Sequence, residues 1–565
     1  MSGYSSLTGR ERSRWPPLTR MLMSGEMSDE KPRPLFLKEK IEVWMVNEGY
    51  RRLFVFTFLI LHVMVFVFGM INYGLTEKSI GARQSFGATF PIARSAALVL
   101  HVDVALILFP VCRNLISIAR RTPLNGVIPF DKNITFHKLV GWSIFFFSWV
   151  HTIAHWNNLA RFAAANRLGF KGFIGANLLT GPGWSGYIML IALCAMVWTA
   201  MEKPRRANFE RFWYTHHLFV VFFVFWSIHG AFCMIKPDFE PLCDGIGVFW
   251  QYWMWGGFAY LGERVSRELR GRHKTFISKV VQHPSNVVEV QIKKEHTRTR
   301  AGQYIFLCCP EVSIWQYHPF TLTSAPEEDY ISVHIRMVGN FTKAFGKALG
   351  CELDRKGGGG GKDSKEKPSG DPQDVALRKI LPRVYIDGPF GSASEDVFKF
   401  EIAVLVGAGI GVTPFASILK SIWYRMNYPQ GSRTRLRKVY FFWICRDFGS
   451  FEWFRSLLLA IEQQDLEDCI EIHTYLTAKI KPDDATNIMI NDANADVDAI
   501  TGLRSPTNFG RPNWDMIFKS IRKIHSPAEA GVFFCGPKGL GSTLHVKCNM
   551  YSEPGFSFVW GKENF

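Results

Sequence analysis

The sequence lacks the usual signals of a cysteine-based metal or redox site and of a calcium-binding loop. Its 565 residues include eleven cysteines, but no two have the C-x-x-C spacing typical of zinc and redox sites. The stretch from Asp492 opens as D-x-N-x-D. Its sixth position is Val497 and its twelfth is Leu503, however, where calcium-binding loops carry Gly and Glu. We therefore expect neither a cysteine metal centre nor a calcium site, and no EF-hand is found towards the N-terminus.

The first part of the sequence also contains no long apolar run. A polar, basic stretch precedes the first such run near Arg52, and no small-residue cleavage site follows it, so we expect no secretory signal peptide. Acidic residues are absent from 156–183. Residues 355–374 are rich in glycine, serine, proline and charge, a composition that cannot form a core, and we expect a disordered insert there.

Long apolar runs between about residues 50 and 262 are the main feature that the sequence does have. Six of them are about long enough to cross a bilayer, which needs roughly 20 residues. They begin near Leu53, Ile92, His137, Trp184, Trp213 and Gly245. Lys and Arg concentrate before the first run, between the second and third, between the fourth and fifth, and after the sixth. The positive-inside rule therefore predicts that both termini face the cytosol.

This topology explains part of the formal net charge of +17 by anchoring to the inner leaflet, so nucleic-acid binding is a poor interpretation of the charge. The predicted topology also assigns each cysteine to a compartment. Nine fall in membrane or cytosolic positions, where we expect reduced thiols. Cys233 and Cys243 fall in the last outward loop, where a disulfide is permitted.

Histidines occur in pairs on two of the apolar runs. His137 and His151 are 14 residues apart, which on a helix gives a rise of about 21 Å and nearly a common face. On the fifth run, His229 is 13 residues from His216 and 12 from His217. An ideal helix would place either pair about 120–140° apart, so a kink or π-bulge would be needed.

Two helices that carry histidines at matching depths have the arrangement that two stacked b-type haems require, with each iron taking one imidazole from each helix. The predicted orientation pairs His137 with His216 near the cytosolic side and His151 with His229 near the outer side. The alternative is that such histidines only form hydrogen bonds between helices. The spacing alone leaves the choice between His216 and His217 open.

The segment from about 274 to 388 has short alternating stretches at 287–292, 302–307 and 331–338, which predict a small antiparallel barrel. Arg336 lies near the end of the last stretch, and a turn at Gly339 follows and opens a predicted helix. An arginine beside a helix N-terminus would bind a pyrophosphate through charge and backbone N–H groups.

From about residue 400 the pattern alternates between strand and helix. A buried strand at 401–406 is followed by GAGIGVTPF, whose glycines let the backbone approach a phosphate. Thr413 is a predicted helix N-cap and Pro414 the first helical residue, so the loop opens an anion site. Arg446 ends the next predicted strand, where an arginine accepts the 2′-phosphate of NADP. Cys535 and Gly536 end a late strand, where open α/β sheets bind ligands.

Together these features resemble the catalytic subunits of NADPH oxidases, the family of the phagocyte flavocytochrome b heavy chain, and are most like a fungal NoxA-type member. The motifs are the paired histidines, HPFTLTSAP (318–326), DGPFG (387–391), VGAGIGVTPF (406–415), FEWF (451–454), GRPNWD (510–515), FCGP and the terminal ENF. The resemblance runs from about Trp44 to Phe565, outside the insert.

The resemblance implies a six-helix transmembrane haem-binding bundle followed by a ferredoxin-NADP reductase-like module, an antiparallel β-barrel FAD domain and an α/β NADPH domain. The implied boundaries are 1–45 for a cytosolic basic segment, 46–265 for the bundle, 270–395 for the FAD domain and 396–565 for the NADPH domain.

The same resemblance assigns roles to individual residues. The implied haem ligands are His137, His151, His216 and His229, with Arg94 and His155 beside the outer haem, where oxygen is reduced. The implied FAD contacts are His318, Pro319, Phe320, Thr321, Leu322, Thr323, Ser324, Arg336, Gly339 and Phe565. The implied NADPH contacts are Gly407, Gly409, Gly411, Thr413, Pro414, Cys535, Gly536 and Pro537, with Arg446 and Arg511 at the 2′-phosphate.

The expected function is electron transfer from cytosolic NADPH through FAD and two b haems to dioxygen, which generates superoxide. A ferric-chelate metalloreductase shares the same electron path, and a non-catalytic haem sensor or scaffold is a third interpretation. Short outward loops without acidic clusters favour dioxygen over a bulky chelate. The resemblance also implies a plasma-membrane or endomembrane location, a cytosolic activator, a Rac-type GTPase and a small membrane partner protein.

Overall fold

The computed structural model describes residues 16–24, 35–232, 234–235, 238, 247–271, 273, 275–294, 297–314, 316–352, 381–428, 434–446, 451–464, 469–477, 497–498 and 500–563. The chain divides into two compact units. One comprises Tyr50–Ser266, and the other combines Met1–Gly49 with Arg267–Phe565.

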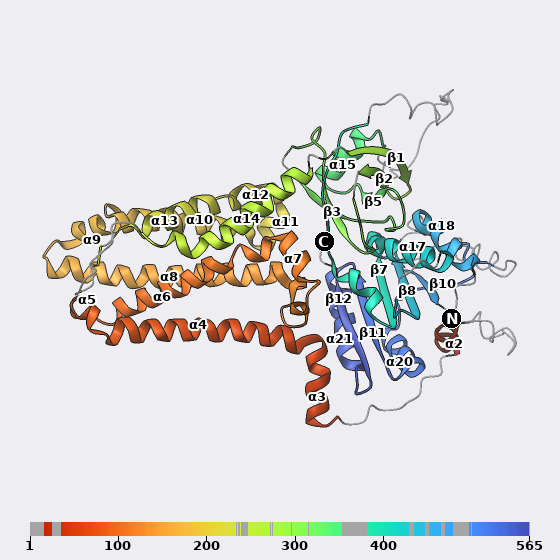
Figure 1. Ribbon diagram of the computed structural model, residues 1–565, viewed down its shortest axis with the longest axis horizontal. Coiled ribbons are helices and arrows are strands. Elements are labelled where there is room, and N and C mark those ends of the chain that lie inside the picture. The colour runs from red at the N-terminus through yellow and green to blue at the C-terminus, as the bar shows by residue number, and fades with distance from the viewer. Residues whose placement is uncertain are drawn as a thin grey trace, which may run out of the picture. The chain divides into compact units, whose positions relative to one another are not determined.

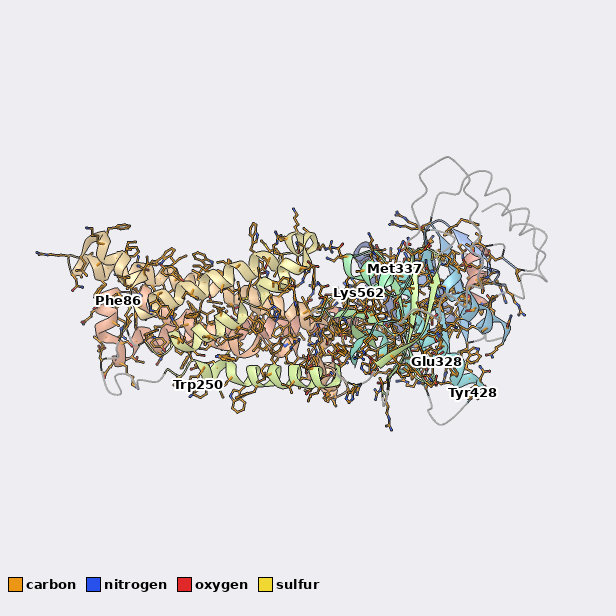
Figure 2. The ribbon with its side chains drawn as sticks, turned by 90° about the horizontal axis from the view of Figure 1, so that it is seen from above. Phe86, Trp250, Glu328, Met337, Tyr428 and Lys562 are labelled. Atoms are coloured by element: carbon orange, nitrogen blue, oxygen red, sulfur yellow. The ribbon has the colours of Figure 1, made fainter. Side chains whose placement is uncertain are left out.

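The unit Tyr50–Ser266 is built from helices that lie side by side in both views (Figure 1, Figure 2). Its principal helices are α4 (Tyr50–Leu75), α6 (Thr89–Leu106), α8 (Asn133–Ala165), α10 (Gly181–Ala200), α12 (Phe209–His216), α13 (Phe219–His229) and α14 (Trp250–Gly271), the last of which continues into the other unit. Shorter helices are α5 (Ile80–Phe86), α7 (Arg113–Ala119), α9 (Gly169–Leu178) and α11 (Glu202–Ala207).

Among the described residues, three helical segments are long and apolar enough to cross a membrane: Leu37–Leu75, Thr89–Val111 and Gly181–Ala200. Large apolar side chains on α4, such as Phe56, Val63 and Phe68, are exposed. A helix with apolar residues on its outer face is typical of a lipid-facing element. A helix nevertheless lies at each of the six predicted runs, although the starts differ by three to five residues at several of them.

The fifth run is interrupted. α12 ends at His216 and α13 begins at Phe219, and between them His217, Leu218 and Val220 each bond the carbonyl three residues earlier. Such a turn advances about 120° per residue instead of about 100°. The extra winding offsets part of the mismatch between His216 and His229 that an uninterrupted helix would have.

The first half of the other unit contains two three-stranded antiparallel sheets. One has the order β1 (Thr275–His283), β2 (Val287–Lys294), β5 (Ile331–Arg336), and the other has the order β4 (His318–Thr321), β3 (Tyr304–Cys308), β6 (Tyr385–Phe390). They share one hydrophobic core with α15 (Asn340–Ala348), and one bridge, between Leu322 and Val333, joins them. The predicted antiparallel strands are present, divided between two sheets.

The second half is a six-stranded parallel sheet in the order β10-β9-β8-β7-β11-β12. Its strands are β7 (Ile402–Ala408), β8 (Lys438–Cys445), β9 (Ile470–Leu476), β10 (Thr507–Phe509), β11 (Ala528–Cys535) and β12 (Phe556–Lys562). Its helices are α17 (Thr413–Asn427), α18 (Glu452–Gln463), α20 (Trp514–His525) and α21 (Lys538–Tyr551). Alternate residues of β7 enter two separate cores, so both faces of the sheet are covered.

The strand order reverses between β7 and β11, and all six carboxyl ends meet at one edge of the sheet. In open α/β sheets this reversal is where ligands bind. The loops after β7 and β11 therefore lie where a dinucleotide is expected.

The N-terminal helices α2 (Pro17–Ser24) and α3 (Leu37–Trp44) pack within this same unit. Leu18 is fully buried beside α20 in one of the two cores of the parallel sheet. The backbone N–H and hydroxyl of Thr19 donate to Glu471 Oε1 at 2.7 and 2.8 Å. Asn47 further along bonds the backbone of β12 at Phe558 and Trp560, each at 2.8 Å.

Candidate functional site

Two pairs of histidine rings face each other between α8 and the α12–α13 segment. The ring centres of His137 and His216 are 6.1 Å apart, and those of His151 and His229 are 6.4 Å apart. A metal–imidazole bond is about 2 Å long and the ring centre lies about 1 Å beyond the nitrogen, so two imidazoles that share one iron have centres about 6 Å apart. Both separations fit an iron between the rings, and the partners are those that the sequence predicts.

Hydrogen bonds orient the two histidines of α8. His137 Nδ1 lies 2.9 Å from the carbonyl oxygen of Ile107, and His151 Nδ1 lies 2.9 Å from that of Ala93. A carbonyl only accepts, so each Nδ1 carries the hydrogen. A lone pair then remains on Nε2, which is the state that a metal ligand needs.

The partner histidines differ in how they are held. His229 Nδ1 lies 2.9 Å from the hydroxyl of Ser185, which itself donates to the carbonyl of Gly181 and so accepts from His229. His216 Nδ1 is buried and has no hydrogen-bond partner within the described part of the chain. The ring of His229 is therefore fixed by a hydrogen bond, whereas the ring of His216 is less constrained.

His217 is placed differently from its neighbour. Its ring is exposed, and its Nδ1 lies 2.8 Å from the carbonyl of Trp213 on the same helix. Only the ring of His216 faces His137. The geometry therefore favours His216 over His217, the choice that the spacing left open.

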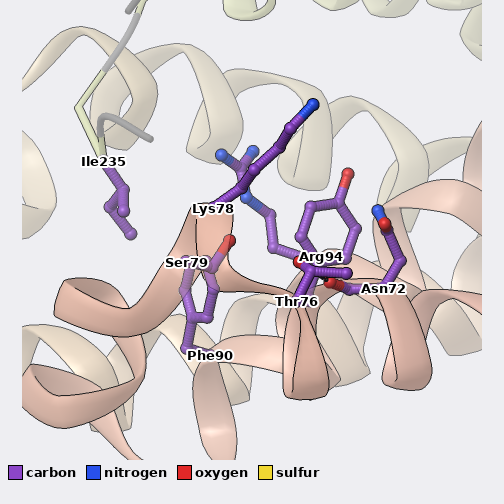
Figure 3. A pocket seen from close by; sticks show the side chains of 8 residues that line it. Asn72, Thr76, Lys78, Ser79, Phe90, Arg94 and Ile235 are labelled. Carbon is purple, nitrogen blue, oxygen red and sulfur yellow. Dashed lines mark hydrogen bonds between the residues drawn. The ribbon is translucent and has the colours of Figure 1, made fainter. Parts of the chain in front are cut away.

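Arg94 lines a pocket of about 180 Å³ in the helical unit (Figure 3). The other lining residues are Asn72, Tyr73, Thr76, Lys78, Ser79, Phe90 and Ile235. The guanidinium lies over the rings of Tyr73 and Phe90 at 5.7 and 5.9 Å, and its buried Nε has no hydrogen-bond partner among the described residues. The pocket thus contains a cation with unused hydrogen-bonding capacity.

His155 and Arg94 both lie close to the pair formed by His151 and His229. The ring of His155 is 4.5 Å from that of His151, one turn away on α8. Arg94 directly follows Ala93, whose carbonyl accepts from His151. The structure therefore brings both predicted oxygen-site residues to the same histidine pair.

The predicted flavin segment forms an edge strand. Within the described strands β4 pairs only with β3, so its other edge is open. His318 stacks on Phe341 of α15 at 4.0 Å, and Pro319 is exposed. Residues 321–324 are buried, and the Thr323 hydroxyl lies within hydrogen-bond distance of Ser332 and His334. The first residues of the motif therefore offer a surface to a ligand. The later residues attach the motif to β5.

Arg336 and Gly339, the predicted pyrophosphate contacts, lie at the end of β5 and at the start of α15. Arg336 is the last residue of β5, is exposed, and forms no ion pair with any described residue. Gly339 is the N-cap of α15, and Thr342 accepts hydrogen bonds from the N–H groups of Val338 and Gly339. An unpaired arginine beside a helix N-terminus fits a phosphate group.

The glycine-rich loop between β7 and α17 has two kinds of glycine. A Cβ at Gly411 would lie 2.3 Å from the carbonyl oxygen of Cys535, and one at Gly407 would lie 2.9 Å from Val412 Cα, so both positions need glycine for internal packing. Gly409 has φ +57° and open space where its Cβ would be. Gly409 is thus the position where the backbone is open to a phosphate.

The predicted N-cap role of Thr413 is wrong. The N-cap is Val412, because a 3-10 turn at Gly409–Val412 leads directly into the helix and gives Val412 a helical conformation. Pro414 lies in the first turn of α17 as its second residue, one position later than predicted. The Thr413 hydroxyl instead lies 2.6 Å from that of Thr321, and Ser417 donates to the carbonyl of Ser324 at 2.7 Å. These contacts join the predicted flavin segment to the predicted NADPH loop.

The remaining predicted NADPH residues lie at the carboxyl edge of the parallel sheet. Cys535 ends β11 and is paired with Gly407, and Gly536 and Pro537 lead into α21. Burial raises the pKa of the Cys535 thiol, so this group is neutral. Arg446 directly follows β8 and Arg511 lies two residues beyond β10, and both are exposed with no ion pair to the described residues.

Sequence comparisons identify the family. The heavy chain of a superoxide-generating NADPH oxidase from Dictyostelium discoideum is 40% identical over 94% of this chain and 99% of its own. Human NADPH oxidase 3 is 37% identical, over 92% and 99%, and mouse NADPH oxidase 1 is 36% identical, over 92% and 95%. The chain belongs to the NADPH oxidase family.

Family models agree with this membership. A ferric reductase like transmembrane component matches residues 101–227, an FAD-binding domain matches 273–394, and a ferric reductase NAD binding domain matches 400–549. The solved structure of a ferredoxin NADP+ reductase from Neisseria gonorrhoeae is 14% identical, with a TM-score of 0.32 over 51% of this chain and 98% of that one. The membership rests on the full-length oxidase relatives.

Several predictions fall outside the described residues: Phe565, the insert at 355–374, Cys233 and Cys243, and half of the rejected calcium loop. Glu563, two residues before Phe565, is described. Its carboxylate accepts from the hydroxyl of Ser392 at 2.8 Å and from the N–H of Ser394 at 2.6 Å. The end of the oxidase chain is thereby anchored beside the segment that follows β6.

Sequence reasoning did not find the groups that support the site. Ser185, which holds His229, and the carbonyls of Ala93 and Ile107 carry no signal in a single sequence, because their role depends on helix packing. His62 and Asp103 were also missed, although two ionisable residues within apolar runs are a detectable signal. His62 Nε2 lies 2.8 Å from Asp103 Oδ1, and both side chains are buried.

Proposed function

We propose that this chain transfers electrons from cytosolic NADPH through FAD and two b-type haems to dioxygen on the opposite side of a membrane, where superoxide is released. The observation that carries the proposal is the pair of histidine couples, with ring centres 6.1 and 6.4 Å apart on the same two helical segments. Oxidase relatives aligned over more than nine-tenths of the chain support the reaction. When bound, FAD accepts electrons in pairs and the haems carry them singly.

The four histidines would hold the two irons. The carbonyls that accept from Nδ1 of His137 and His151 direct the opposite nitrogens of these rings toward their partners on α12 and α13. The positive-inside pattern supports His137 and His216 as the cytosolic couple and His151 and His229 as the outer couple. The proposed six spans follow the helices that lie at the six apolar runs.

Arg94 and His155 would act on oxygen. Arg94 carries a positive charge in the pocket beside the outer couple, and its buried Nε has no protein partner in the described part of the chain. A fixed cation stabilises negative charge as it develops, and the effect is large where water is excluded. Arg94 would therefore favour one-electron reduction of dioxygen to an anion. Since the Arg94 pocket measures about 180 Å³, it suits a small acceptor better than a chelate.

Charged and backbone groups would bind the nucleotides. Arg336 and the N-terminus of α15 would take the flavin pyrophosphate, with the open edge of β4 and Phe565 at the ring system. Gly409 and the N-terminus of α17 would take the NADPH pyrophosphate, and Arg446 and Arg511 its 2′-phosphate. The contact between Thr321 and Thr413 supports a short path between the two nucleotides.

Further parts of the proposal concern organisation. We propose the domain boundaries 1–45, 46–265, 270–395 and 396–565, a location in the plasma membrane or an endomembrane with both termini cytosolic, and activation by a cytosolic activator, a Rac-type GTPase and a small membrane partner protein. Support comes from the resemblance to the oxidase family. The fungal NoxA-type assignment stays a prediction.

The test is a comparison of acceptors in activated membranes supplied with NADPH. Cytochrome c reduction that superoxide dismutase abolishes would support the oxidase. Ferric-chelate reduction that persists without oxygen, with little superoxide, would show a metalloreductase. Pyridine haemochrome analysis of the purified chain gives the haem count independently, and one haem or none would contradict the two-couple assignment.

A further inference from the structure

Three potential metal ligands lie on one face of the sheet β1-β2-β5, outside the predicted electron path. Glu289 of β2 is directly opposite His334 of β5 and opposite Val281 of β1. His283 lies two residues beyond Val281, and residues two apart on a strand point to the same face. The strand register alone therefore places His283, Glu289 and His334 together, on rigid elements and not on a loop.

Their potential ligand atoms converge on one point. Glu289 Oε2 is 3.6 Å from His283 Nε2 and 3.8 Å from His334 Nε2, and all three atoms lie within 4.8 Å of one another. Two donors on one tetrahedral metal ion, with bonds of about 2.0–2.2 Å, are about 3.3–3.5 Å apart. A contraction of a few tenths of an ångström would complete the geometry for Glu289 with either histidine.

The opposite atoms of two of these groups are already bonded, which points the converging atoms inward. His334 Nδ1 is 2.9 Å from the Thr323 hydroxyl, and Glu289 Oε1 accepts from the Gln291 amide at 2.9 Å. Metal-bound histidines and carboxylates usually have such outer partners. His283 Nε2, in contrast, is buried and has no hydrogen-bond partner in the described residues.

The donor set suits a cation. Metal binding requires an anionic carboxylate beside neutral imidazoles, and the Glu289 carboxylate lies beside the imidazoles of His283 and His334.

We propose that His283, Glu289 and His334 bind a divalent transition-metal ion of the zinc type, with water as the fourth ligand. Two imidazoles and one carboxylate exclude calcium and magnesium, which prefer all-oxygen sites, and fit zinc coordination with one open position. The proposal does not depend on the electron path, because none of the three residues belongs to the predicted haem, flavin or NADPH sites.

The contacts of His334 indicate what the ion does. Its ring packs on Trp453 and Phe454 of α18, with centres 6.0 and 4.9 Å away, and its Nδ1 faces Thr323 of the predicted flavin segment. A metal bond would fix the orientation of the imidazole against which α18 packs. Loss of the ion should therefore loosen the contact between His334 and α18.

The test measures metal on the purified full-length protein in detergent. After chelator treatment and dialysis against ZnCl2, elemental analysis should give about one zinc per chain beside the haem iron, and Glu289→Gln, which removes a proposed ligand, should retain clearly less zinc than the unmutated chain. His273→Ala, at an exposed histidine just before β1, is the matched control and should retain zinc. Zinc content below a tenth of an equivalent in the unmutated chain, or equal retention by Glu289→Gln, would overturn the proposal.

A second measurement avoids dependence on a variant that fails to fold. The unmutated chain titrated with Co²⁺ should develop the visible absorption of a four-coordinate cobalt site, recorded as a difference from the haem spectrum, with saturation at one equivalent. Absence of that signal up to several equivalents would overturn the proposal. Zinc added afterwards should remove the signal.

Discussion

His62 on α4 and Asp103 on α6 form a buried hydrogen bond, with Nε2 and Oδ1 2.8 Å apart. The second oxygen of Asp103 accepts from the Ser143 hydroxyl of α8 at 2.6 Å, and His62 Nδ1 lies 2.8 Å from the Phe58 carbonyl. One carboxylate thereby connects the three helices α4, α6 and α8. Because lipid supplies no water to replace these bonds, the three helices have a strongly preferred register.

Removing one member of this pair should destabilise the helical unit. Asp103→Ala leaves a buried imidazole without its partner, and we expect a loss of about 3–5 kcal/mol. Replacing both residues with leucine should restore most of the loss, because an apolar pair needs no partner. Thermal loss of the haem spectrum in detergent measures the effect. A double variant as unstable as Asp103→Ala would contradict this explanation.

Ser185 should control only the couple formed by His151 and His229. Ser185→Ala removes the hydroxyl that holds His229 Nδ1, so we expect a shifted midpoint potential or weaker retention of one haem while the other is unchanged. Ser95→Ala is a suitable control, since the Ser95 hydroxyl bonds only the carbonyl of Pro91 on its own helix. Redox titration followed by haem absorption distinguishes the two. Equal shifts in both haems would argue against a local effect.

Arg446 and Arg511 should recognise the 2′-phosphate of NADPH. Each charged hydrogen bond contributes about 1.5–3 kcal/mol, so Arg446→Ala should raise KM for NADPH about 10–100-fold and leave KM for NADH nearly unchanged. Arg437→Ala, at the other end of β8, should affect neither cofactor. Steady-state diaphorase kinetics with both nucleotides provides the measurement. If KM rises equally for NADH, the arginine does not recognise the extra phosphate.

Arg94 should act after the haems are reduced. Arg94→Ala should slow superoxide release about tenfold or more, with both haem spectra and flavin reduction retained, because the positive charge is lost from the pocket. Arg94→Lys keeps the charge and should recover part of the rate. The measurement is dismutase-sensitive cytochrome c reduction. A normal rate in Arg94→Ala would remove this residue from the oxygen site.

Acid should release helix α2. Burial alone would raise the pKa of Glu471, but His473, the Thr19 hydroxyl and Lys438 outweigh this, and the folded-state pKa is lowered. A lowered pKa contributes stability that is present above the unfolded value of about 4.3 and is lost as pH falls through the folded value. Hydrogen exchange of residues 17–24 should therefore be slow at pH 7 and faster below about pH 4.

The control for this effect is a variant that abolishes the charge at any pH. Glu471→Gln should give fast exchange of α2 at pH 7, whereas Thr19→Ser, which keeps both donors, should behave as the unmutated chain. Protection that is the same in Glu471→Gln as in the unmutated chain would show that apolar packing of Leu18 alone holds the helix.

The sequence predicted those parts of the site that depend on spacing within one element. The distance between His137 and His151 and the glycine loop after β7 are local patterns, and both lie where expected. Thr413 was misassigned because a 3-10 turn is not visible in residue types. Register between strands distant in the chain is equally invisible, so nothing in the sequence paired Glu289 with His334. The docking of α2 was missed because an eight-residue helix with Leu18 and Leu22 one turn apart is too short for a periodic signal.

The bonds from Thr19 to Glu471 and from Asn47 to Trp560 span 452 and 513 residues. During synthesis, the amino-terminal segment leaves the ribosome long before either partner exists. It therefore has none of these native contacts while the apolar region is translated and inserted into the membrane. Closure of these long loops can only be a late event, because loop entropy opposes it until the parallel sheet has formed. The amino-terminal segment can therefore dock only on a chain whose last strand has been synthesised and has joined the sheet. In an incomplete chain this segment would stay accessible to proteolysis and quality control.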